Sequence, residues 1–399
     1  MGPTGRGANS TLRASATRVL SGDAGYAHFH FLGLETTLYM LITPITPHLR
    51  RYAVALGALL LVVLVLSGCS AAPQGEAWSS PAVGNTTIYY GSHDGRLLAV
   101  DTTNAQLRWE FPPSSASSLG SIYAAPAVTK DTVYVGGYNR NLYAVDAASG
   151  SQRWEFRTQG PIIGGPTLAD SLVIVGSSDQ KVYAVDATNG GQRWQFETQD
   201  AIWSTPAVAG QTVYVASLDH RLYALDAASG QPRWQFEATG ALPGTPVADG
   251  DTVYVGSMDS KLYAVDAQTG QPRWEFTASN WFWGKPLVLT ETVYAASLDH
   301  SLYAVDRATG QQRWSFQAGG VIRGGPDFVA GNIIVAADDG KVYALQPASG
   351  TLAWQYDVGA PIHAAPTVSD NRIYVNVDKG PLLAIDATSR GVAWRFDKK

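Results

Sequence analysis

A repeat of 40 residues constrains this chain more than any other feature of its sequence. Eight tryptophans mark the repeat, and after a first interval of 45 residues every interval is 40: Trp109, Trp154, Trp194, Trp234, Trp274, Trp314, Trp354 and Trp394. Eight prolines precede them, each by 28 residues: Pro81, Pro126, Pro166, Pro206, Pro246, Pro286, Pro326 and Pro366. Two markers at one fixed offset indicate an architecture built by adding equal units.

Each unit reads as four short strands separated by turns. In the fourth unit we expect strands over residues 205–208, 212–216, 221–225 and 232–236, with turns at 218–220 and 226–230. No segment carries a helical period, which excludes a helical solenoid. Four strands in each of eight units predict an all-β, eight-bladed β-propeller of four-stranded antiparallel blades.

A secretion signal precedes the repeat. Arg50 and Arg51 are followed by an apolar run over residues 52–66 and then by Leu66-Ser67-Gly68-Cys69. A basic segment, an apolar stretch shorter than a membrane span and a small-residue cleavage site are typical of a signal peptide. The LSGC sequence resembles the bacterial lipoprotein box, in which the cysteine is acylated. The alternatives are an uncleaved membrane anchor and an ordinary cleaved signal.

The sequence therefore divides into four parts. Residues 1–39 are an upstream extension, either mistranslated sequence before a start at Met40 or a real disordered segment. Residues 40–68 form the lipoprotein signal peptide, residues 69–77 a lipidated tether, and residues 78–399 the propeller. We expect an extracytoplasmic protein, attached to a membrane through the lipid on Cys69. That membrane is the outer membrane if the host has one, and otherwise the outer face of the cell membrane.

The run from Ala144 to Trp154 resembles the tryptophan-docking motif of quinoprotein (PQQ-like) propellers, A-x-D-x-x-x-G-x-x-x-W. The resemblance extends over roughly residues 78–399 and assigns the eight repeat tryptophans to structural docking. Three units depart from the motif, with Ala105 and Arg390 at the glycine position and Gln346 at the aspartate position. A lipidated eight-bladed propeller is also similar to the propeller lipoproteins of the outer-membrane β-barrel assembly (BAM) machinery, which are non-enzymatic scaffolds.

Composition excludes several kinds of chemistry. The single cysteine, Cys69, permits neither an intramolecular disulfide nor a cysteine-based zinc site. A net charge of −5 without a basic run argues against nucleic-acid binding.

An aspartate recurs 13 residues after most of the prolines, and we assign it to turn capping rather than to calcium. His220 and His300 lie in blades that are not neighbours, so a shared metal site is not expected. We predict no metal, no cofactor and no enzyme activity.

The residues three positions before each proline are expected at the mouth of the central channel: Trp78, Tyr123, Ile163, Trp203, Pro243, Trp283, Arg323 and His363. None of these eight is a carboxylate, which disfavours the calcium that quinoprotein dehydrogenases use. The four tryptophans outside the repeat all lie just before a repeat proline: Trp78, Trp203, Trp281 and Trp283. Because aromatic residues and arginine anchor binding surfaces, the predicted partner or ligand site comprises Trp78, Tyr123, Trp203, Trp281, Trp283, Arg323 and His363. The alternative is that these rings only fill a wide channel.

These features favour a monomeric, non-catalytic, lipid-anchored scaffold that binds envelope or membrane proteins. Outer-membrane protein assembly is the form that the family resemblance implies. An alternative is a module that binds a small ligand, glycan or peptide at the channel mouth. A PQQ-dependent dehydrogenase is a minor alternative, because fold alone does not determine function.

Overall fold

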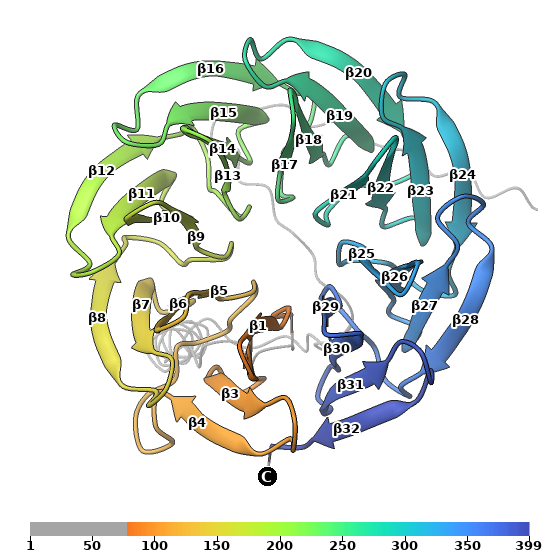
Figure 1. Ribbon diagram of the computed structural model, residues 1–399. Coiled ribbons are helices and arrows are strands. Elements are labelled where there is room, and N and C mark those ends of the chain that lie inside the picture. Colours follow the sequence, from red (N-terminus) through yellow and green to blue (C-terminus); the bar gives the residue numbers. More distant parts are fainter. Residues whose placement is uncertain (1–77, 399) are drawn as a thin grey trace, which may run out of the picture. The chain divides into compact units, whose positions relative to one another are not determined.

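The computed structural model describes residues 78–398 (Figure 1). The predictions for the extension, the signal peptide, Cys69 and the tether concern residues outside this part. Within it there is no helix, and so no helix that could cross a membrane.

The strands of the first four blades follow the chain in order. They are β1 (Ala82–Gly84), β2 (Thr87–Gly91), β3 (Leu97–Asp101), β4 (Leu107–Phe111); β5 (Ala127–Val128), β6 (Thr132–Gly136), β7 (Asn141–Asp146), β8 (Gln152–Arg157); β9 (Thr167–Ala169), β10 (Leu172–Gly176), β11 (Lys181–Asp186), β12 (Gln192–Glu197); β13 (Ala207–Ala209), β14 (Thr212–Ala216), β15 (Arg221–Asp226), β16 (Pro232–Glu237).

The strands of the last four blades continue the same pattern. They are β17 (Val247–Asp249), β18 (Thr252–Gly256), β19 (Lys261–Asp266), β20 (Pro272–Thr277); β21 (Leu287–Leu289), β22 (Thr292–Ala296), β23 (Ser301–Asp306), β24 (Gln312–Gln317); β25 (Asp327–Val329), β26 (Asn332–Ala336), β27 (Lys341–Leu345), β28 (Leu352–Asp357); β29 (Thr367–Ser369), β30 (Arg372–Asn376), β31 (Leu382–Asp386), β32 (Val392–Phe396).

The eight sheets form a closed ring of four-stranded antiparallel blades, which confirms the predicted fold class. In every sheet the strands are hydrogen-bonded in chain order. The first strand of each blade lies toward the centre and the fourth on the rim (Figure 1). In blade 4 the predicted second strand matches β14, and the third and fourth strands, β15 and β16, each extend one residue beyond the prediction. The first strand, β13, begins two residues later than predicted.

Each repeat tryptophan joins its blade to the next one. The Trp194 ring packs on Gly230 of the following blade, and its indole N–H donates to the Ala227 carbonyl at 3.0 Å. Gly230 has a φ of +71°, and a Cβ there would lie 2.6 Å from the ring, so glycine is required both for the turn and for the contact. The same N–H bond to the next blade is made by six further tryptophans: Trp109, Trp154, Trp234, Trp274, Trp314 and Trp394.

The last blade meets the first without exchanging a strand. Trp394 donates to the Thr102 carbonyl at 2.7 Å, as in the other seams. The Asn376 amide, 2% exposed, donates to the carbonyls of Ser79 at 3.0 Å and Gly91 at 3.3 Å. The other units have glycine or alanine at the position of Asn376. A polar side chain that no other unit has at this position therefore connects the last blade to the first.

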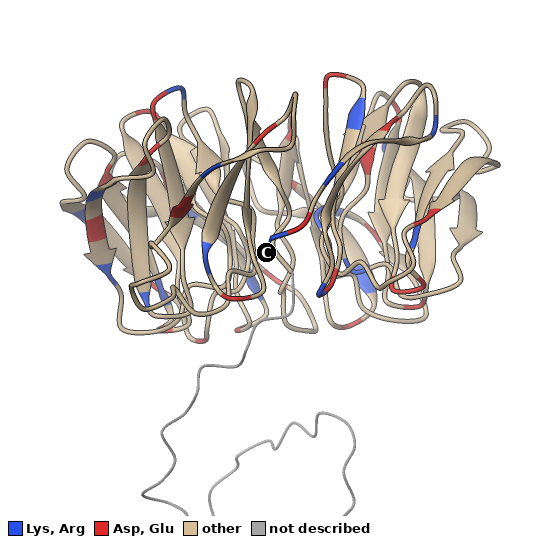
Figure 2. Cartoon of the chain, turned by 90° about the horizontal axis from the view of Figure 1, so that it is seen from below, with Lys and Arg blue, Asp and Glu red and all other residues tan. Residues whose placement is uncertain are grey.

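Charged residues of both signs are distributed around the disc (Figure 2). Many are paired within one blade, as in the ion pair between Arg233 and Asp226 at 2.7 Å. In the view of Figure 2, basic and acidic segments alternate, and no stripe of a single sign is seen.

Candidate functional site

Two rings of residues lie on the same face of the propeller and define its channel mouth. The first ring is the one predicted from the sequence, three residues before each proline. The second ring lies on the turns between the second and third strands: His93, Tyr138, Ser178, Leu218, Met258, Leu298, Asp338 and Asp378. Backbone hydrogen bonds hold these turns against the segments that carry the first ring, for example Leu218 N–H to the Ala201 carbonyl at 3.0 Å and Asp338 N–H to the Val321 carbonyl at 2.9 Å.

One half of the mouth is polar and centres on Trp78. Its ring stacks on His363 with centroids 5.3 Å apart, and the Arg323 guanidinium lies 5.4 Å from its centroid. Tyr123 contacts the same indole edge-on at 6.4 Å. Arg323 precedes blade 7 and Trp78 precedes blade 1, and these blades are not adjacent. Side chains from the segments that precede blades 7, 8, 1 and 2 therefore contact one another.

Asp338 organises this polar half. Its carboxylate accepts hydrogen bonds from the Arg323 Nε at 2.9 Å and pairs with the His363 Nδ1 at 2.9 Å. Burial opposes ionisation of Asp338, but the bonds from His363 and Arg323 outweigh it and hold the pKa of the carboxyl below its ordinary value. A second carboxylate oxygen, on Asp378, lies 3.9 Å from the His363 Nε2. The arginine and histidine of the mouth are thus fixed by carboxylates.

The other half of the mouth is apolar. Trp203 and Trp283 lie with ring centroids 6.1 Å apart, although they precede blades 4 and 6 and Pro243 lies between them in the ring. The second ring supplies Leu218, Met258 and Leu298 on this side. Trp281 lies two residues before Trp283, and its side chain is 36% exposed. The mouth is therefore divided into an aromatic-apolar half and a charged half.

The structure brings the predicted residues together in two clusters rather than one. Trp78, Tyr123, Arg323 and His363 form the polar cluster, and Trp203 with Trp283 forms the apolar pair. Sequence reasoning missed Asp338 and Asp378. The sequence contained a sign of both residues. They lie 12 residues after their prolines, at a position where the other six units carry no carboxylate.

The repeated turn aspartates accept hydrogen bonds from nearby backbone N–H groups and a tyrosine hydroxyl. Asp179 accepts from the Lys181 N–H at 3.1 Å, from the Tyr183 hydroxyl at 2.9 Å and from the Gln159 N–H at 2.7 Å. The equivalent aspartates Asp219, Asp259 and Asp299 bond the corresponding tyrosine in the same way. In residues 78–398 no group of three or more histidine, cysteine, aspartate or glutamate side chains is arranged to hold a metal ion.

The mouth does not fit the calcium and quinone of a quinoprotein dehydrogenase. Calcium needs several oxygen ligands, whereas the Asp338 carboxylate is already paired with Arg323 and His363. The His363 ring stacks on Trp78 and covers that face of the indole against a flat cofactor. The residues of the mouth therefore support no catalytic step through such a group.

Comparisons with known proteins agree with the propeller fold. The model of the PQQ_2 family, described as outer membrane protein assembly factor BamB, matches residues 70–154, 114–241, 236–322 and 320–399. Among solved structures, BamB from Moraxella catarrhalis is 21% identical with a TM-score of 0.66, covering 76% of this chain and 95% of that one.

Solved enzymes share the fold as well. A quinohemoprotein alcohol dehydrogenase from Pseudomonas putida HK5 is 17% identical with a TM-score of 0.64, covering 77% of this chain and 69% of that one. The corresponding enzyme from Comamonas testosteroni is 17% identical with a TM-score of 0.67, covering 82% and 76%. Likenesses at these identities show the fold alone, and no curated protein matches the sequence. The family match extends over the whole propeller, and the chain therefore belongs to the family of outer membrane protein assembly factor BamB.

Proposed function

We propose that this protein is a non-catalytic scaffold of the cell envelope, which binds a membrane protein through its channel mouth. The observation that carries the proposal is the match of the BamB family model along the entire propeller. That family is described by its role in outer membrane protein assembly, and we extend this role to the present chain.

The composition of the mouth supports partner binding. Binding energy at interfaces is concentrated in a few aromatic and arginine side chains, and the mouth presents Trp78, Trp203, Trp283 and Arg323. Asp338 holds Arg323 in place, which lowers the entropic cost of ordering that side chain when a partner binds. A rigid ring that positions such groups acts by placement rather than by chemistry.

The lipid anchor belongs to the same proposal. Cys69 lies nine residues before Trp78. A chain of that length spans at most about 30 Å when fully extended. Acylation of Cys69 would therefore keep the propeller close to the membrane surface and raise the local concentration of a membrane-embedded partner. Export to an outer membrane is proposed for a host that has one.

Affinity capture from detergent-solubilised native membranes tests the proposal. Wild-type protein should recover an integral membrane protein, and the Trp203→Ala/Trp283→Ala double variant should recover at least ten-fold less. The matched control is Leu107→Ala/Leu352→Ala, which removes two exposed apolar side chains, 42% and 41% exposed, from outer strands away from the mouth. The control should recover as much partner as wild type.

A ligand-binding module is the second candidate, and the Trp203–Trp283 pair favours it. Two indoles 6.1 Å apart in one channel mouth could bind a small aromatic, glycan or peptide. Recovery of no membrane protein with any form would contradict the scaffold proposal. Saturable quenching of tryptophan fluorescence by a small ligand, abolished by Trp283→Ala, would then support the module.

A further inference from the structure

A pair of aromatic rings lies in six of the blade seams. The outer strand of one blade supplies a phenylalanine, and the third strand of the next supplies a tyrosine. Phe156 and Tyr183 lie with centroids 5.3 Å apart, and Phe196 and Tyr223 with centroids 5.2 Å apart. The remaining four pairs are Phe111–Tyr143, Phe236–Tyr263, Phe276–Tyr303 and Phe316–Tyr343. A regular seam of the repeat therefore contains one tyrosine ring.

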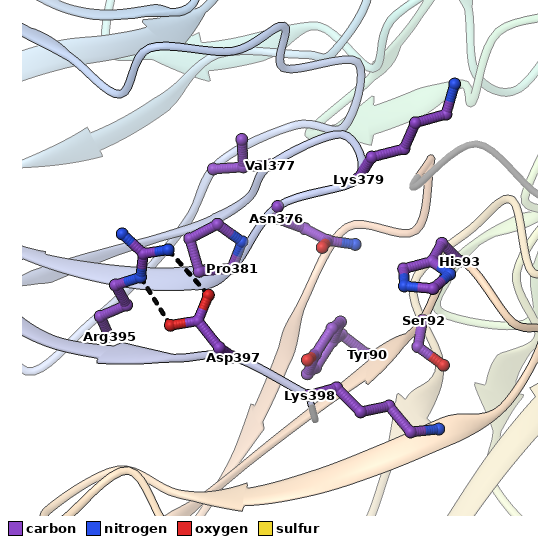
Figure 3. Close-up of a pocket in the computed structure, with 11 residues that line it drawn as sticks. Tyr90, Ser92, His93, Asn376, Val377, Lys379, Pro381, Arg395, Asp397 and Lys398 are labelled. Atoms are coloured by element: carbon purple, nitrogen blue, oxygen red, sulfur yellow. Dashed lines mark hydrogen bonds and ion pairs between the residues drawn. The ribbon is translucent and has the colours of Figure 1, made fainter.

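Blades 1 and 8 carry leucine instead of this tyrosine, at Leu98 and Leu383. In blade 1 the loss is compensated. Tyr90 lies directly opposite Leu98 on the neighbouring strand, where the other units have valine or alanine, so that its ring occupies the same seam. Lys398 completes this seam by pairing with Asp94 at 2.7 Å and Glu110 at 3.0 Å. Figure 3 shows Tyr90 and Lys398 beside the cavity of about 170 Å³ that remains there.

In blade 8 no aromatic ring replaces the missing tyrosine, although Val377, which is buried in the core cluster of Leu383, stands where the other units have serine, glycine or alanine. The residue opposite Leu383 is Val375, as in the ordinary units, so neither member of the pair is aromatic. A cavity of about 230 Å³ opens at this seam between blades 7 and 8. Tyr356 of the preceding outer strand lines it, in the place of the repeat phenylalanine, together with Val358 and Leu383.

We propose that this cavity binds one aromatic side chain, a tyrosine or phenylalanine, presented by a partner protein. A cavity of about 150 Å³ accepts a benzene ring, so a space of about 230 Å³ is sufficient for one ring. Its wall is mixed, with the charged residues Asp357, Asp378, Lys379 and Arg395 beside the apolar ones. Tyr356 offers the edge-on contact that a phenylalanine makes with the missing tyrosine in the other seams. Lys379 stands where six other units have aspartate, and its ammonium group can donate to a phenolic oxygen.

The occupant comes from outside the propeller. Residues 70–77, between Cys69 and the propeller, contain no aromatic residue. The cavity also reaches the turn that carries Asp378 and Lys379, and so adjoins the polar half of the channel mouth. The inference rests on the proposed function in one respect: the partner that binds the mouth supplies the ring.

The cavity itself is tested with p-cresol, which is the tyrosine side chain cut at Cβ. Titration into wild-type protein should shift the methyl resonances of Leu383 and Val392 in a saturable manner. The Leu383→Tyr variant restores the residue of the repeat, should raise the thermal unfolding midpoint, and should weaken p-cresol binding at least ten-fold. Unperturbed methyl resonances in wild type, or undiminished binding to the folded variant, would overturn the proposal.

Partner capture tests the second step separately. Leu383→Tyr should recover at least ten-fold less membrane protein than wild type while remaining more stable than it. If the variant recovers as much partner as wild type and Trp203→Ala/Trp283→Ala does not, the ring-binding inference is wrong and the scaffold proposal stands. If wild type recovers no membrane protein, the scaffold proposal fails, and the p-cresol titration still decides whether the cavity accepts a ring.

Discussion

At the scale of single residues, two positions carry a side chain where the docking turn of the repeat has glycine. Ala105 and Arg390 stand where six units have glycine, and both have a left-handed backbone, with φ of +57° and +62°. For a residue with a Cβ this conformation costs about 1–2 kcal/mol. Both departures lie in the two blades that meet where the ring closes.

Ala105→Gly should therefore stabilise the protein. We expect the free energy of unfolding to rise by about 1 kcal/mol, because glycine adopts the left-handed conformation without steric cost. Equilibrium denaturation in urea measures the change. The matched control is Gly230→Ala, which introduces a Cβ 2.6 Å from the Trp194 ring at a φ of +71° and should destabilise by more than about 1 kcal/mol. A stabilised Gly230→Ala variant would contradict the steric account.

The docking turns should make the propeller sensitive to acid. A hydrogen bond from Arg233, followed by one from Ser229, lowers the pKa of Asp226 to about 2. The unfolded aspartate has a pKa near 3.9, so this group stabilises the folded state above that value and loses its effect as the pH falls through 2. The thermal midpoint of wild type should fall between about pH 5 and pH 2. Arg233→Gln should show a smaller fall, and an equal fall in both proteins would rule out this pair as a cause.

At the scale of strands and seams, the eight docking tryptophans are not equivalent. Trp194 donates its indole N–H to the next blade, whereas no such bond is found in residues 78–398 for Trp354, whose ring packs in the core cluster that contains Ala387. The turn facing Trp354 is the one that carries Arg390 in place of glycine. The Arg390 departure thus coincides with a missing bond from the blade before it, whereas Trp394, which faces the turn with Ala105, keeps its bond.

Replacement of tryptophan by phenylalanine separates the hydrogen bond from the ring. Trp194→Phe leaves the Ala227 carbonyl without its donor and should cost about 1 kcal/mol for the lost bond, in addition to the effect of the smaller ring. Trp354→Phe loses only ring area. Differential scanning calorimetry should place the midpoint of the Trp194 variant below that of the Trp354 variant. The reverse order would show that the N–H bond adds nothing to docking.

The same seams show what the sequence could predict. The period of the repeat and the positions of the blade 4 strands to within two residues follow from local pattern, because every unit repeats the same local contacts. The docking role of a tryptophan such as Trp194 came from the family resemblance. Asp338 beside Arg323 and the space beside Leu383 depend on departures from the repeat in two units at once. Their consequences become visible only when the blades are placed side by side.

At the scale of the whole molecule, closure of the ring depends on a residue that the repeat does not favour. The other seven units have glycine or alanine at the position of Asn376. Asn376→Gly restores this pattern, yet it removes two bonds from a buried amide to blade 1. We expect a loss of about 1–3 kcal/mol, measured by urea denaturation. Ala216→Gly at the equivalent site of blade 4 is the control for backbone entropy, and an equal loss in both variants would remove the special role of Asn376.

The attachment of the propeller to the lipid bilayer should depend on Cys69. Because each buried CH₂ of an acyl chain contributes about 0.8 kcal/mol, removal of the acylated thiol by Cys69→Ala should move the protein from the membrane fraction to the soluble fraction after secretion. Its thermal midpoint should not change, since Cys69 lies outside residues 78–398, which form the propeller. Cell fractionation with immunodetection measures the shift. A variant that remains in the membrane fraction would indicate an uncleaved anchor over residues 52–66 in place of a lipid. The tether between the membrane and the mouth would then be longer than the nine residues that separate Cys69 from Trp78.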